Sequence, residues 1–92
     1  MRRIEIEKEI SGKTDIELRK VSTVIETFFT AVKEHLVNND PVSLRGLGRF
    51  SLKSRAAKVA RNIHKNIAVD IPAHNIPFFK PSKEFRIKVK GL

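Results

Sequence analysis

The clearest pattern in the chain is a helical spacing of hydrophobic residues between positions 21 and 36. The apolar side chains that follow the i, i+3, i+4, i+7 rule of an amphipathic α-helix are Val21, Val24, Ile25, Phe28, Phe29, Val32 and Leu36. Thr14-Asp15-Ile16-Glu17 fits a capping box at the start of this helix, because Thr14 and Glu17 can each satisfy the other's backbone amide. Asn38 to Pro41 end it, since asparagine tolerates the left-handed conformation and proline cannot continue a helix. The pattern predicts one long helix with an ordinary core face.

The residues before this helix fit two structures. Ile4 and Ile6 alternate as in a strand, whereas Ile6 and Ile10 have the spacing of a helix. Gly12 is expected to stop whichever element precedes it. Periodicity alone leaves both readings open.

After Pro41 the period of the hydrophobic pattern changes from that of a helix to that of a strand. Val42 and Leu44 alternate with polar residues, Gly46-Leu47-Gly48 interrupts the alternation, and Phe50 and Leu52 resume it. This order predicts a β-hairpin with a glycine turn.

The next segment resembles a long, thinly hydrophobic β-ribbon. Two extended runs, at about 53–61 and 67–72, flank a polar stretch at 62–66. Small residues stand where a core strand would be bulky, at Ala56, Ala57, Ala60 and Ala68. Such a ribbon is expected to project from the body and to add little to the core, which leaves only about seventy residues to bury apolar surface. A dimer with a shared helical core is therefore expected.

The last segment resumes hydrophobicity but again fits two structures. Ser82 is a plausible N-cap of a helix. Phe85 and Val89 are spaced as in a helix, while Phe85, Ile87 and Val89 are spaced as in a strand. The choice between them stays open on these residues.

Charge is distributed unevenly along the chain. The composition, with 40% hydrophobic and 32% charged residues, is that of a globular protein, and the net charge is +9. Residues 1–41 carry 7 Lys/Arg against 8 Asp/Glu, and residues 42–92 carry 12 against 2. The second half would repel itself without a bound anion. Nucleic acid is the partner this favours, ahead of charge that merely solubilises and of an anionic membrane surface.

Other kinds of function find little support in the sequence. The chain has no cysteine, which excludes disulfides and Cys-based metal sites. His35, His64 and His74 lack the spacing of metal ligands, and no Ser/His/Asp arrangement is readable. We expect no enzyme activity, no metal and no cofactor. No signal peptide and no apolar run long enough to span a bilayer is recognisable.

Three stretches in order and spacing resemble the HU/IHF family of bacterial histone-like DNA-binding proteins. They are SLRGLGRF at 43–50, RAAKVARN at 55–62 and VDIPAHNIPFFKPSKEF at 69–85. The resemblance implies an α+β fold: an intertwined dimer with N-terminal helices, a three-stranded antiparallel sheet with a projecting β-ribbon arm, and a short C-terminal helix. It favours helices at 3–12 and 82–90. It further implies a cytoplasmic, nucleoid-associated protein that forms a homodimer, or a heterodimer with a related subunit.

On this basis residues 1–92 form one HU/IHF-like domain. Residues 1–41 would be its helical dimerisation part, and residues 42–92 its sheet, its arm at about 53–75 and its C-terminal helix. The expected function is to bind double-stranded DNA through the minor groove with low sequence specificity, and to bend and compact it. The expected DNA-binding residues are Arg45, Arg49, Lys53, Arg55, Lys58, Arg61, Asn62, Ile63, Lys65, Lys80 and Lys83. Solvated sheet charge is an equally good account of Arg45, Arg49 and Lys53.

The arm tip departs from the family pattern. The family has Arg-Asn-Pro followed two residues later by Gly, and the proline wedges between base pairs. Here Ile63 takes the wedge position and Asn66 the glycine position. Isoleucine is among the side chains that minor-groove proteins insert into base steps, so Ile63 is expected to serve as the wedge. The alternative is a neutral replacement with weaker kinking.

An RNA-binding or ribosome-associated interaction protein is the alternative from another class. Such proteins often stack bases on exposed aromatic side chains. The chain has six Phe but no Tyr or Trp, and all six Phe lie in contexts typical of a core. This pattern argues against an RNA-stacking platform.

Overall fold

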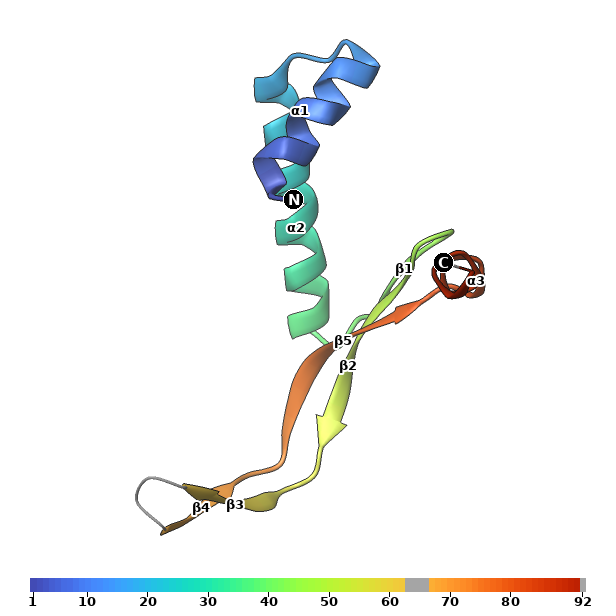
Figure 1. The fold of residues 1–92 in the computed structure, drawn as a ribbon. Coiled ribbons are helices and arrows are strands. Elements are labelled where there is room, and N and C mark those ends of the chain that lie inside the picture. Colours follow the sequence, from blue (N-terminus) through green and yellow to red (C-terminus); the bar gives the residue numbers. More distant parts are fainter. Residues whose placement is uncertain (63–66, 92) are drawn as a thin grey trace. The chain divides into compact units, whose positions relative to one another are not determined.

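The protein is described by a computed structural model, which defines residues 1–62 and 67–91. The chain divides into two compact units, Met1–His35 and Leu36–Leu92. The described residues form three helices and antiparallel β-structure (Figure 1), which confirms the α+β class expected from the sequence.

The first unit is a pair of helices, α1 (Arg3–Thr14) and α2 (Leu18–Val37), the second of which extends two residues beyond the unit. The helix at the N-terminus is thus confirmed, but it continues through Gly12. The predicted capping box is wrong, because Thr14 closes α1: its hydroxyl donates to the Ile10 carbonyl oxygen at 2.7 Å. Asp15 then takes the left-handed conformation, with φ of 59°, and reverses the chain.

A polar cluster joins the two helices. Glu7 is buried, at 3% exposure, and accepts a hydrogen bond from Arg3 Nε at 2.6 Å. Its other carboxylate oxygen accepts from the Ser22 hydroxyl on α2. Arg3 also reaches Glu26 at 2.6 Å, and its guanidinium lies 5.3 Å from the centre of the Phe29 ring. Ion pairs and hydrogen bonds thus form part of the contact between these helices.

The apolar stripe of α2 is largely uncovered within one chain. Val21 and Leu36 are the buried hydrophobic residues of the described chain, while Val24 is 66% exposed. Phe28 and Phe29 are also exposed. The helix ends at Val37, and Asn39 adopts the expected left-handed conformation, with φ of 56°.

The second unit contains a three-stranded antiparallel sheet in the order β1 (Val42–Leu44), β2 (Gly48–Arg55), β5 (His74–Pro81). The predicted hairpin with its glycine turn is confirmed, and Gly46 supplies the positive φ, 87°. β5 carries two prolines, which is compatible with its place at the sheet edge, where one row of amides is not needed for pairing. The C-terminal helix α3 (Lys83–Lys90) follows, with Ser82 as the expected N-cap.

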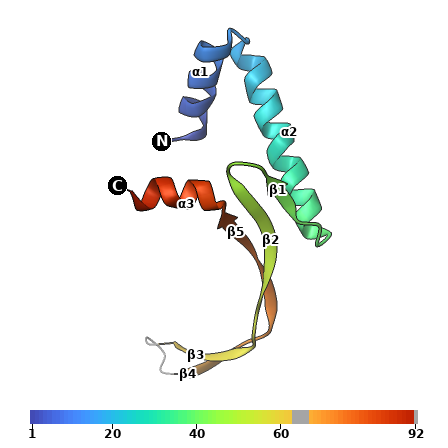
Figure 2. The same cartoon turned by 90° about the vertical axis from the view of Figure 1, so that its right-hand side faces the viewer.

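The ribbon consists of β3 (Lys58–Asn62) and β4 (Ile67–Ile71), paired antiparallel. The predicted run at about 53–61 is interrupted at residues 56–57, whereas the run at about 67–72 corresponds to β4. Residues 56–57 and 72–73 separate β3–β4 from β2–β5 (Figure 2). Pro72 has no amide to donate at this point. The register nevertheless continues unchanged from Arg55↔His74 to Lys58↔Ile71, since each strand omits two residues.

Gly48 is needed for the close approach of β2 and β5. A Cβ atom there would lie 2.5 Å from the Lys80 carbonyl oxygen and 2.7 Å from the Phe79 ring. We expect Gly48→Ala to lower the free energy of unfolding by about 1–3 kcal/mol through overpacking. Gly12→Ala is the matched control, because nothing lies within 4 Å of its added Cβ in α1. It should raise stability by about 0.5–1 kcal/mol through helix propensity. Chemical denaturation of both variants tests this, and equal effects would contradict it.

The Glu7 cluster predicts a pH dependence of stability. Hydrogen bonds from Ser22 and Arg3 lower the pKa of Glu7 from its ordinary value of 4.5. A carboxyl whose pKa is lower in the folded state stabilises the fold above its unfolded pKa, and this stabilisation disappears as the pH falls through the folded value. The thermal midpoint should therefore fall more steeply below pH 4.5 in the wild type than in Glu7→Gln. Glu9→Gln, which removes an exposed acid from the same helix, should keep the wild-type slope. Parallel pH profiles for all three proteins would contradict the prediction.

Candidate nucleic-acid interface

The sheet has two chemically different faces, because directly paired residues of antiparallel strands point to the same side. One side is apolar, and on it the rings of Phe50 and Phe79 lie 4.8 Å apart. The opposite side, called the basic face below, is formed by Ser43, Arg49, Ser51, Lys53, Arg55, His74, Ile76, Phe78 and Lys80. Four of the expected DNA-binding residues thus share one face.

Cations stand directly opposite one another on the basic face. Arg49 is paired with Lys80. The set that forms this face contains no acid, and like charges directly opposite each other destabilise a sheet. A surface that keeps such a pair exposed is suited to an anion that lies across both strands.

An aromatic side chain lies in the middle of these charges. Phe78 is 38% exposed, and Lys53 Nζ lies 4.8 Å from the centre of its ring. The expectation that every Phe lies in a core-like context is therefore wrong for Phe78. Side chains along residues 74–81 alternate between the two faces of the sheet, so Phe78 and Phe79 point to different faces. Knowledge of the strand bounds would have revealed this from the sequence.

The interruption between sheet and ribbon forms a hollow of about 360 Å³. Its lining consists of Arg55, Ala56, Ala57, Lys58, His74 and Ile76. The two alanines thus mark the break and not the interior of a strand. Their small size leaves room between the cationic side chains of Arg55 and Lys58, which gives the hollow the charge and space for a phosphate-sized anion.

The ribbon extends the set of basic residues. Lys58 is exposed and lies opposite Ile71, while Arg61 and Asn62 are in register with Ala68 and Ile67. Hydrophobic side chains here are poorly covered: Val59 is 68% exposed and Ile67 52%. Ile63 and Lys65 lie outside the described residues.

The remaining two predicted residues lie where the β1–β2 turn meets α3. Arg45 is in the turn, and Lys83 begins the helix. Ser82 connects them: its hydroxyl donates to the Gly46 carbonyl oxygen at 3.1 Å and accepts from the Phe85 amide at 3.2 Å. This contact holds both cations near the same end of the sheet. Sequence reasoning did not include the further exposed cations of α3, which are Arg86, Lys88 and Lys90.

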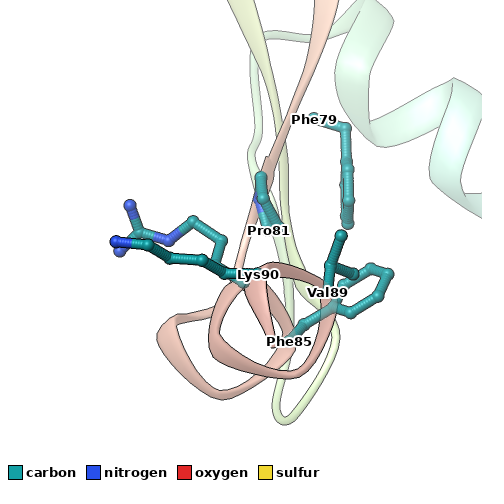
Figure 3. Close-up of a pocket in the computed structure, with 6 residues that line it drawn as sticks. Phe79, Pro81, Phe85, Val89 and Lys90 are labelled. Atoms are coloured by element: carbon teal, nitrogen blue, oxygen red, sulfur yellow. The ribbon is translucent and has the colours of Figure 1, made fainter. Parts of the chain in front are cut away.

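A groove lies between β5 and α3 on the apolar side. It has a volume of about 310 Å³ and is lined by Phe79, Pro81, Phe85, Arg86, Val89 and Lys90. Phe79, Phe85 and Val89 point toward one another in it, whereas Lys90 extends away (Figure 3). The groove is thus an apolar surface with a charged rim.

Residues 1–62 and 67–91 contain no group of three His, Cys, Asp or Glu side chains that could hold a metal ion. No helix in these ranges combines the length and apolarity needed to cross a membrane.

A family model described as bacterial DNA-binding protein matches residues 1–90. Integration host factor subunit beta from Marinobacter nauticus is 33% identical over 84 residues, which cover 91% of this chain and 86% of that protein. The SPbeta prophage-derived DNA-binding protein HU 2 of Bacillus subtilis is 31% identical over 91 residues, with 99% of each chain covered.

Solved structures give the same likeness. HU from Anabaena, in a cocrystal with DNA, matches with a TM-score of 0.91 and 29% sequence identity, over 97% of each chain. HU from Thermotoga maritima matches with a TM-score of 0.68 at 20% identity, over 97% of this chain and 98% of that one. The second likeness concerns the fold alone.

Proposed function

The chain belongs to the family of bacterial DNA-binding proteins that includes HU and integration host factor, and from this membership we propose that it binds duplex DNA as a dimer and bends it. The observation that carries the proposal is the basic face of β2–β5, which leads through the Arg55–Lys58 hollow into the basic ribbon. This family is defined by DNA binding and DNA architecture, and not by catalysis.

Binding rests on phosphate contacts from both strands of the sheet and ribbon. Arg49, Lys53 and Lys80 meet the backbone on the sheet, and Arg55 and Lys58 meet it at the hollow. Arg61, Asn62 and Lys65 continue toward the minor groove, while Arg45 and Lys83 extend the surface at the other end. Phosphate contacts set position and orientation but carry no sequence information, and the minor groove mainly separates A·T from G·C. Sequence specificity is therefore low.

Bending depends on the tip of the ribbon. Ile63 follows Arg61-Asn62 where the family carries a proline, and it acts as the apolar wedge. Bending a short duplex costs on the order of 1–6 kcal/mol, and unstacking a base step costs a few kcal/mol more. The additional phosphate contacts that a bent duplex makes offset this cost.

A dimer accounts for the apolar surface that one chain leaves uncovered. The α2 stripe exposes Val24, Phe28 and Phe29, and the groove between β5 and α3 exposes Phe85. Exposed apolar surface of this extent marks an interface. Residues 1–41 form the dimerisation part of a single domain, and residues 42–92 form its DNA-binding part. A second, related subunit could take the place of the identical chain.

Association with the nucleoid follows from this function, because a protein that binds DNA without sequence preference is distributed along the chromosome. RNA binding is the competing function. The relatives and the cocrystal are named for DNA, and this supports a DNA duplex as the ligand.

Assembly predicts that stability depends on protein concentration. The chain has a mass of 10.5 kDa, and sedimentation should give twice this value, with a thermal midpoint that rises with concentration. Phe28→Asp places a charge in the uncovered stripe and should reduce the mass to that of one chain. Thr27→Asp, beside it and outside the stripe, should leave the dimer intact. A single-chain mass for the wild type would contradict the dimer.

DNA binding predicts a steep dependence on salt. With about six to eight phosphate contacts per dimer, log K should fall with log salt with a slope of roughly −5 to −7. Fluorescence energy transfer across one duplex, intact or nicked, should report a large bend that is reduced in Ile63→Ala.

Two outcomes separate the parts of this proposal. A steep slope with an unchanged bend in Ile63→Ala would remove the wedge and leave a ribbon that coats DNA. Equal affinity for duplex DNA and duplex RNA would instead favour the RNA-binding function.

A further inference from the structure

Phe78 has a position that packing of the sheet does not explain. It lies on the basic face, directly opposite Ser51, which is too small to cover its ring. The contacting rings of Phe50 and Phe79 occupy the other side of the same strands. Phe78 therefore lies on the side of the sheet away from that pair, which it shares with Ile76, and 38% of its surface is exposed.

Charged residues frame this ring. Arg49 and Lys80 lie beyond one end of it, and Arg55 lies beyond the other. Lys53 lies over the ring, with Nζ 4.8 Å from its centre. The face thus presents an apolar centre enclosed by cations.

A DNA duplex matches this arrangement. Its backbone alternates anionic phosphates with deoxyribose, whose surface is largely carbon and hydrogen. Cations at both ends of the face can meet phosphates, and an aromatic ring between them can cover the sugar that joins them. Apolar aromatic surface removed from water stabilises such a contact in proportion to its area.

We propose that Phe78 is itself a DNA-contacting residue, which packs its ring against the deoxyribose surface of a bound duplex at the centre of the basic face. The inference rests on the proposed function, because it requires that this face meets duplex DNA. The Lys53 ammonium, which lies over the ring in the free protein, moves onto an adjacent phosphate in the complex. The ring supplies the part of the affinity that does not depend on counterion release.

The test is a double-mutant cycle on one DNA duplex, with affinity measured across a salt series for wild type, Phe78→Ala, Lys53→Gln and the double variant. Phe78→Ala should weaken binding roughly 5-fold through lost apolar contact, with an unchanged salt slope. Lys53→Gln should reduce the slope by about 1. Loss of the ring should weaken binding by a similar factor in the Lys53→Gln background.

Further variants keep the test independent of folding. Phe78→Leu retains apolar bulk and should recover most of the affinity that Phe78→Ala loses. Val37→Ala removes apolar surface that is 82% exposed at the end of α2 and should leave affinity unchanged.

The inference is overturned if Phe78→Ala binds as tightly as wild type at every salt concentration. It is also overturned if its effect vanishes in the Lys53→Gln background, since the ring would then only position the lysine. Reduced dimer mass in Phe78→Ala would identify the ring as part of a contact between chains and overturn it likewise. Failure of the proposed function is distinguishable, because the wild type would then lack salt-dependent binding to duplex DNA.

Discussion

The pairing of β2 with β5 is the constraint on which the binding surface depends. Gly48 lets the two strands approach where any larger residue would meet the Lys80 carbonyl oxygen. The contact between the tilted rings of Phe50 and Phe79 supports the same register from the apolar side. A slip of one residue would move every side chain of a strand to the opposite face. It would scatter the cations and bring charge among the apolar rings.

This register explains how much of the site could be read from the sequence. The basic residues were recognisable one by one, because charge is a property of each residue. Their assembly on one face was not, since it joins odd positions of β2, such as Lys53, to even positions of β5, such as Lys80. The residues on this face change from odd to even numbers between β2 and β5, and nothing local in the sequence fixes this change. Phe78 was missed for the same reason.

The sequence around a helix end predicted that end correctly where the capping residue had only one possible structural role. Ser82 follows Pro81 and precedes a helical pattern, and it caps α3 as expected. Thr14 had two roles available, because a threonine can begin the second helix or bond back to the carbonyl oxygen of Ile10 and end the first. Thr14 takes the second role, and the hydrogen bond between Glu7 and Ser22 that joins α1 to α2 accompanies it. That contact is tertiary, so the capping pattern could not reveal it.

Stability and binding are divided between the two sides of the sheet. The opposed cations Arg49 and Lys80 weaken the sheet in the absence of a ligand. The contact between the Phe50 and Phe79 rings and the close packing on the other side compensate for this repulsion, which lets the basic face remain free of acids. Neutralising those cations with local carboxylates would stabilise the free protein, but it would also remove the charge that attracts a polyanion. The unfavourable charge of this face is therefore the cost of its function, and the apolar side of β2–β5 is what allows the fold to bear it.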